Sequence, residues 1–200
     1  MKKKPVKSVD TTQHQQIKQA VKVLQQGGII AYPTEAVYGL GCDAKDLSAI
    51  KKILELKQRD KEKGLILIAA DFEQLTSYIK PLEKGIEEKI LSAWRDSAHA
   101  ITWLVPVKES VSDYLKGKFD TLAVRVSKHP VVKELCEMFG GAIISTSANI
   151  ANQEAARTSE QVKKIFENKI DLVLDGETDL DAQASEIRDA LSDKIIRPAN

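Results

Sequence analysis

The sequence predicts an α/β protein in which helices pack on a single sheet, and three observations favour this class. Short apolar runs typical of buried strands alternate along the chain with segments of helical periodicity. The 200 residues suit one hydrophobic core, and no repeat, low-complexity tract or long Pro/Gly/Ser linker divides them. We therefore predict one domain over residues 1–200, in which residues 1–12 form a flexible basic extension.

The first helix is predicted from apolar residues at helical spacing, namely Ile17, Ala20, Val21 and Leu24. Thr12 and Gln15 are placed to form a capping box at its start, and Gly27-Gly28 to stop it. The next elements expected are a buried strand over 29–32 that Pro33 ends, a helix over 47–57 and a strand over 65–70.

The second half of the chain continues the alternation. Pro130 suits the first position of a helix over 131–139, which Gly140-Gly141 ends. Further helices are expected around Ile90 and over 158–166. The strands expected here lie at 101–107, 122–126, 142–145, 172–174 and 195–196.

The composition excludes several classes of protein. Hydrophobic residues make up 42% and charged residues 30%, which is typical of a globular rather than a disordered chain. The formal net charge is +1, so a nucleic acid or a membrane would have to be met by a local patch. No apolar run reaches membrane-spanning length, and the lysine-rich N-terminus lacks the apolar core of a signal peptide. With two cysteines and no CxxC, we expect a cytoplasmic protein without a disulfide framework.

Two segments rich in small or charged residues are candidates for ligand binding, residues 33–41 and 57–63. In the first, the glycines allow close backbone approach and Thr34 offers a hydroxyl, although an ordinary turn explains the pattern as well. The second carries four cations. If extended, it would direct them to one side as a clamp for an oligophosphate, and the alternative is a solvated helix end. These cations are Lys57, Arg59, Lys61 and Lys63.

A third candidate segment, Ser145–Asn149, ends a predicted buried strand with three hydroxyls and a carboxamide. These neutral groups suit an anion, but a plain Ser/Thr turn is an equal alternative. Arg125 interrupts an apolar strand, so it binds either an anion or a structural carboxylate. No metal-binding spacing and no nucleophile–base arrangement stands out.

Taken together, these segments resemble the YrdC/TsaC family. The resemblance follows the order of its motifs and covers nearly the whole chain, from about Gln13 to Pro198. The motifs are PTEAVYGLG at 33–41, the KxR element at 57–59 with Lys63-Gly64-Leu65, the strand with Arg125, STSAN at 145–149, SEIRD at 185–189 and IIRP at 195–198.

The resemblance implies a twisted, open, mixed sheet with a large basic concave cavity. It also implies the synthesis of L-threonylcarbamoyladenylate from L-threonine, bicarbonate and ATP, for the t6A modification of adenosine 37 in tRNA. Lys57 and Arg59 would be catalytic. Threonine would be held by Thr34, Arg125 and Ser145. The nucleotide would be held by Lys57, Arg59, Lys63, Thr121, Ser147, Asn149 and Arg197.

For this reaction we expect Mg²⁺ to accompany ATP, bound mostly through phosphate oxygens and water, and we assign no residue as its ligand. Implied partners are tRNA or double-stranded RNA, and proteins like TsaD, TsaB and TsaE for the transfer step. The chain departs from the family pattern at Asp60, at Arg95–Ala100 and at Ile150–Glu154. A non-catalytic RNA-binding module is the alternative function, and another nucleotidyl or carbamoyl transferase is a third.

Overall fold

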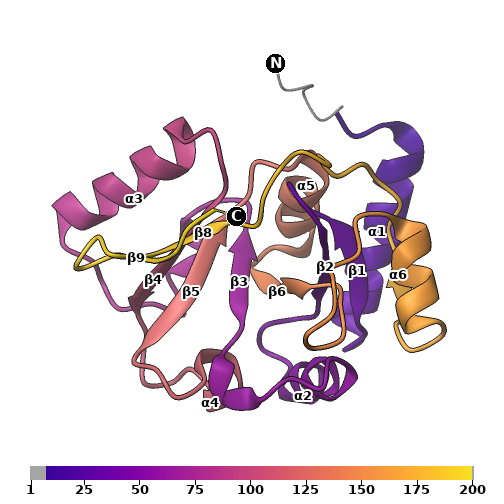
Figure 1. The fold of residues 1–200 in the computed structure, drawn as a ribbon, viewed down its shortest axis with the longest axis horizontal. Coiled ribbons are helices and arrows are strands. Elements are labelled where there is room, and N and C mark those ends of the chain that lie inside the picture. Colours follow the sequence, from indigo (N-terminus) through magenta and orange to yellow (C-terminus); the bar gives the residue numbers. More distant parts are fainter. Residues whose placement is uncertain (1–7, 200) are drawn as a thin grey trace.

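The structure is a computed structural model that describes residues 8–199, and these residues form one mixed, open, nine-stranded sheet with helices on both faces (Figure 1). The order of the strands is β7-β1-β2-β6-β3-β5-β4-β8-β9. Their bounds are β1 Ile30–Pro33, β2 Tyr38–Gly41, β3 Ile66–Ala69, β4 Ile101–Pro106, β5 Thr121–Val126, β6 Ile143–Ser147, β7 Leu172–Val173, β8 Glu186–Asp189 and β9 Ile195–Arg197. The predicted fold class is therefore confirmed.

Six helices are described, and all of them except α4 begin close to the predicted positions. They are α1 Thr11–Gln25, α2 Leu47–Leu56, α3 Lys84–Asp96, α4 Asp113–Lys116, α5 Pro130–Phe139 and α6 Ser159–Phe166, with short 3₁₀ turns η1 Lys61–Lys63 and η2 Glu73–Leu75. The predicted capping box of α1 is wrong, because Asp10 is the N-cap and its carboxylate accepts a hydrogen bond from Gln13 N. Since α1 begins at Thr11, the predicted extension ends too late, and its residues 1–7 lie outside the described part.

Helices cover the two faces of the sheet unequally. Leu67 and Val124 join the core under α2 and α3, whereas Ile68 and Ile143 join the core under α1 and α5. Consecutive residues of a strand point to opposite faces, so these helix groups lie on opposite sides. Arg125 pairs in register with Ile68 and shares its face. The sheet face that α1 and α5 cover therefore also carries Arg125. This side chain lies on the part of the face that the two helices leave open.

Five elements were not predicted from the sequence, namely β2, β8, α4 and the turns η1 and η2. Residues 61–63 form the turn η1 rather than an extended stretch, because Asp60 accepts a hydrogen bond from Glu62 N at 2.9 Å and starts the turn. The single-sided row of four cations, which required residues 57–63 to be extended, therefore does not form.

The segment between β7 and β8, residues 174–185, runs across the molecule from the side of α6 to β8 (Figure 1). We call it the crossing segment. None of the helices in residues 8–199 combines the length and apolar character that a membrane-spanning helix needs.

Candidate active site

A cavity of about 550 Å³ lies on the open part of this sheet face. Its floor is made of alternate strand residues, which point to the same side. Thr121, Ala123 and Arg125 come from β5, and Ser145 and Ser147 come from β6. The cavity thus lies over the sheet as well as at strand ends, so the sheet itself fixes the spacing of these side chains.

The cavity brings together nearly all of the predicted site residues from distant parts of the chain. Those in its lining are Thr34, Arg59, Lys63, Thr121, Arg125, Ser145, Ser147, Asn149 and Arg197. Lys57 is the exception. Residues in the lining that the sequence reasoning did not assign include Lys116, Phe119, Gln153 and Ser185.

The lining is cationic. It contains five basic side chains, Arg59, Lys63, Lys116, Arg125 and Arg197, and no carboxylate among the described residues. Since hydroxyl groups and the Asn149 and Gln153 carboxamides supply the other polar groups, the cavity suits a ligand with several negative charges.

At one end of the cavity, Arg59 is fixed by its neighbours in the chain. Its Nε and one terminal nitrogen donate to the Gly64 carbonyl at 3.2 and 2.9 Å. Lys116 lies at the end of α4, and its Nζ is 2.8 Å from the Asp113 carboxylate. Asp60 caps η1 and is not in the lining, so this departure from the family pattern adds no anion to the cavity.

Thr34, Arg125 and Ser145 are buried at 4%, 8% and 5% exposure. Thr34 Oγ1 donates to the Val37 carbonyl at 2.7 Å, which closes the turn between β1 and β2. Arg125 NH1 lies 3.7 Å from Glu35 Oε2, so the structural carboxylate that its position demanded is Glu35. Arg125 still lines the cavity, and it therefore has both a structural partner and access to a ligand.

Arg197 comes from the last strand. Its guanidinium donates to the Ser185 carbonyl at 2.7 Å, which ties β9 to the end of the crossing segment. Thr121 lies at the start of β5, on the same face as Arg125.

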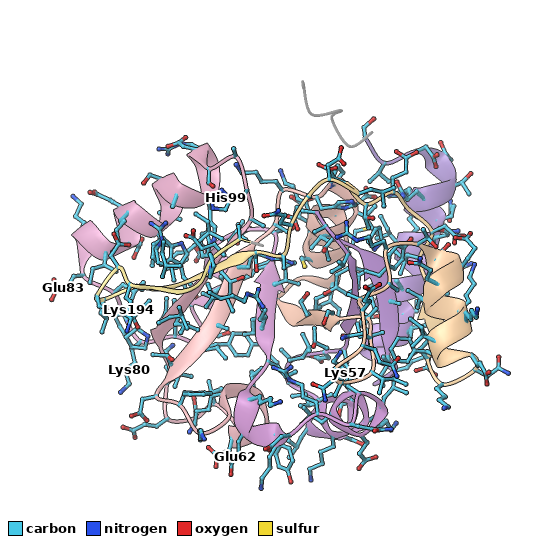
Figure 2. All side chains as sticks on the ribbon, viewed as in Figure 1. Lys57, Glu62, Lys80, Glu83, His99 and Lys194 are labelled. Atoms are coloured by element: carbon cyan, nitrogen blue, oxygen red, sulfur yellow. The ribbon has the colours of Figure 1, made fainter. Side chains whose placement is uncertain are left out.

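Lys57 lies inside the protein, with 3% exposure, and Figure 2 shows it between α2 and β6, whereas Glu62 points away from the molecule. Its Nζ donates to the Ser147 carbonyl, to the Asn149 carbonyl at 2.7 Å and to Asn149 Oδ1 at 2.9 Å. Lys57 is absent from the cavity lining. The structure therefore does not place Lys57 in the direct contact with a ligand that the sequence predicted. All three N–H donors of its ammonium group bind protein oxygens instead.

The loop after β6 takes its shape from these bonds. Ser147 Oγ donates to Asn149 Oδ1 at 2.7 Å, and Asn149 Nδ2 donates to the Gln153 carbonyl at 2.6 Å. Lys57 therefore holds the backbone of a loop whose side chains face the cavity. Burial and the nearby Arg59 lower the pKa of Lys57 to about 8.

No cluster of His, Cys, Asp and Glu in residues 8–199 is arranged to hold a metal ion. Both cysteines are buried, and burial raises their pKa values, so neither is an activated thiol. The fold and the site define an α/β protein with a cavity that suits an anionic ligand, and no Cys, His, Asp or Glu is among the described residues that line it.

Comparison with known proteins identifies the family to which this α/β protein belongs. A model of the Sua5, YciO and YrdC family, described as "telomere recombination", matches residues 22–199. The chain belongs to this family.

Two curated relatives illustrate the similarity. The threonylcarbamoyl-AMP synthase of Photobacterium profundum is 45% identical over 183 residues, which cover 90% of this chain and 97% of that protein. The protein of the same name from Saccharophagus degradans is 48% identical over 179 residues, covering 90% and 92%.

Two solved structures share the fold. Sua5 of P. abyssi in complex with L-threonine has a TM-score of 0.83 and 32% identity over 93% of this chain. The match covers 54% of the Sua5 chain, so this chain spans about half of its length. YciO of E. coli has a TM-score of 0.76 at 24% identity, covering 93% and 90% of the two chains, and that likeness concerns the fold alone.

Proposed function

We propose that this chain is a threonylcarbamoyl-AMP synthase, a nucleotidyltransferase that makes L-threonylcarbamoyladenylate and pyrophosphate from L-threonine, bicarbonate and ATP. The observation that carries the proposal is that Thr34, Arg125 and Ser145 share one cavity with Arg59 and Lys63. Curated relatives bear this name, and the similar Sua5 protein has been seen with L-threonine.

The two groups of side chains suggest how the cavity is divided. Arg125, with the Ser145 and Thr34 hydroxyls, suits the carboxylate and amine of an amino acid. Arg59, Lys63 and Lys116 suit the phosphates of ATP, which enters as its Mg²⁺ complex. Since the described lining contains hydroxyls and two carboxamides but no carboxylate, the metal would be held mainly by phosphate oxygens and water.

In the proposed reaction, the threonine amine adds to the carbon of CO₂ derived from bicarbonate and gives a carbamate with loss of a proton. A carbamate oxygen then attacks the α-phosphorus of ATP, and the bond to the β-phosphate breaks to release pyrophosphate. Both reactants are anions that repel each other. The cations and hydroxyls of the cavity neutralise and align them, so no covalent enzyme intermediate is required.

Pyrophosphate release, measured with each substrate omitted in turn, tests this proposal. A synthase requires threonine, bicarbonate and ATP together. Turnover of ATP with a different acceptor would point instead to another nucleotidyl or carbamoyl transferase. Salt-dependent binding of double-stranded RNA or tRNA without turnover would favour the RNA-binding module.

The wider setting is part of the same proposal. We place the enzyme in the cytoplasm, where its product would pass to proteins like TsaD, TsaB and TsaE for transfer to tRNA. The product is a mixed anhydride that water can hydrolyse, which favours prompt use by such partners. Mixing the enzyme with these proteins and unmodified tRNA would test transfer directly.

We expect Lys63→Met to lower kcat/KM for ATP by at least about tenfold, because one charged phosphate contact is worth about 1.5–3 kcal/mol. No side-chain hydrogen bond or ion pair of Lys63 occurs among the described residues, so thermal stability should stay unchanged. Steady-state kinetics and a melting curve provide the measurement. Lys61→Met is the matched control, since Lys61 belongs to the same turn but not to the cavity lining. Equal effects of the two substitutions would refute a specific phosphate contact.

The buried ammonium of Lys57 predicts a limb in the pH profile. Above about pH 8, its pKa, Nζ loses one of the three donors that hold the loop after β6, so activity should fall. Because this folded-state pKa lies below the ordinary value of about 10.4, the unfolded chain binds more protons between these two values. The contribution of Lys57 to the free energy of unfolding therefore rises with pH in that window. Activity that falls from about pH 8 while the melting temperature does not follow it would match this expectation, and a flat profile would contradict it.

A further inference from the structure

The ion pair between Arg125 and Glu35 lies between two cavities. Arg125 lines the candidate active site, whereas its partner Glu35 lines a second cavity of about 610 Å³ on the other side. Glu35 directly follows Thr34, which belongs to the active-site lining. Glu35 therefore stands in the wall between the cavities, close to the proposed threonine site but outside it.

Arg125 has few contacts for a buried cation. Its NH1 lies 3.7 Å from Glu35 Oε2, at side-chain exposures of 10% and 24%. Neither Arg125 Nε nor Glu35 Oε2 has a hydrogen-bond partner among the described residues. An unpaired guanidinium at this depth would be costly, so the charge of Glu35 is what keeps it there.

Glu35 is itself firmly held. Its Oε1 accepts hydrogen bonds from Ser127 Oγ at 2.6 Å and from Lys128 N at 3.2 Å, and both residues follow the end of β5. Its backbone carbonyl accepts from Asp179 N at 3.0 Å, in the crossing segment. Burial alone would raise the pKa of the Glu35 carboxyl, but Arg125 and the Ser127 hydroxyl outweigh it and hold this pKa below its usual range. Glu35 is thus an anchored anion.

We propose that Glu35 is a positioning residue that orients the Arg125 guanidinium for the carboxylate of the amino-acid substrate. The inference rests on the proposed function, because it concerns the threonine end of the same site.

The geometry explains why orientation matters. A guanidinium is planar, and it binds a carboxylate well only when two N–H groups point at the two oxygens. Glu35 attracts one terminal nitrogen, so the plane is set while the buried Nε–H has no partner among the described residues. Direct contact between Glu35 and the substrate carboxylate would be repulsive, which agrees with its place in the second cavity.

The test is Glu35→Gln, which removes the charge but keeps an amide oxygen for the Ser127 hydroxyl. We expect KM for threonine to rise by at least about tenfold while KM for ATP stays within about twofold. Calorimetric titration with threonine alone should show the same loss of affinity.

Glu186→Gln is the matched control. Glu186 also forms a buried pair with an arginine, Arg188 NH2, at 2.6 Å, but it lines neither cavity. It should leave both KM values unchanged, so a change confined to Glu35→Gln would not reflect the mere loss of a buried pair. Melting curves of both variants check that the fold is kept.

The outcomes separate the two proposals. If the wild-type protein releases no pyrophosphate in response to threonine, the proposed function fails. If the wild type is active and Glu35→Gln leaves KM for threonine unchanged, or raises both KM values equally, the positioning role of Glu35 is overturned.

Discussion

Lys57→Met is expected to lower threonine-dependent pyrophosphate release by at least about 100-fold. The substitution removes three hydrogen bonds to the loop after β6, and of the two carbonyls involved only that of Ser147 keeps a partner among the described residues, Asn149 N at 3.0 Å. A hydrogen bond from a charged donor is worth about 1.5–3 kcal/mol, and the loss of two such bonds from a loop that lines the cavity corresponds to about 100-fold or more in rate. Initial rates at saturating substrates, together with the melting temperature, provide the measurement.

The effect should be transmitted through the loop. We therefore expect that Asn149→Ala also lowers activity and that the double variant is hardly worse than Lys57→Met, because both changes break the same contacts. Effects that multiply in the double variant would show instead that Lys57 acts on the substrate separately. Lys52→Met on the exposed side of α2 is the control, since it removes a lysine from the same helix without touching the loop.

Gly117→Ala is the second substitution with a large expected effect, a loss of stability of about 3 kcal/mol or more. Gly117 has a φ of +70°, and a Cβ there would lie 2.6 Å from Gly64 N and would also meet the Glu62 carbonyl. The backbone around η1 would have to move away from α4. Because Gly64 and Lys63 line the cavity, we expect kcat/KM for ATP to fall as well. Denaturant unfolding and steady-state kinetics measure the two effects.

Gly140→Ala is the control that separates the cost of an unfavourable backbone conformation from the cost of a steric clash. Gly140 ends α5 with a φ of +79°, but a Cβ there would meet nothing within 4 Å. Its substitution should cost only the unfavourable backbone conformation, about 1 kcal/mol. If Gly117→Ala destabilised the protein no more than Gly140→Ala, the close packing of η1 against α4 would be disproved.

Local patterns predicted most of the fold, because periodicity reflects burial directly. The stripe of α1 and the Pro130 start of α5 are confirmed. The strand β2 was not predicted because the two glycines of Tyr38-Gly39-Leu40-Gly41 are typical of a loop. In the structure, glycine at position 39 suits the strand because a Cβ there would come close to Tyr32 and Ser145. The charged strand β8 was missed because its partners β4 and β9 are known only from the tertiary structure.

The site residues could be predicted as a set, but their separate roles could not. The prediction for Lys57 assumed an extended chain, whereas the end of α2 turns this side chain inward to the loop after β6. Glu35 was missed because nothing in the sequence pairs it with Arg125, far along the chain. Lys116 was missed because its approach to the cavity depends on α4. Motifs thus identified which residues gather, while their contacts depend on long-range packing.

The crossing segment and the strand β9 have a consequence for synthesis of the protein. Thr34 and Arg197 line one cavity, yet translation produces Arg197 long after Thr34. A nascent chain that has not yet reached β9 therefore lacks part of the cavity wall, however well its early helices have formed. The protein completes its ligand-binding hollow late in its synthesis, and a chain terminated before β9 would lack the part of the wall that Ile196 and Arg197 supply.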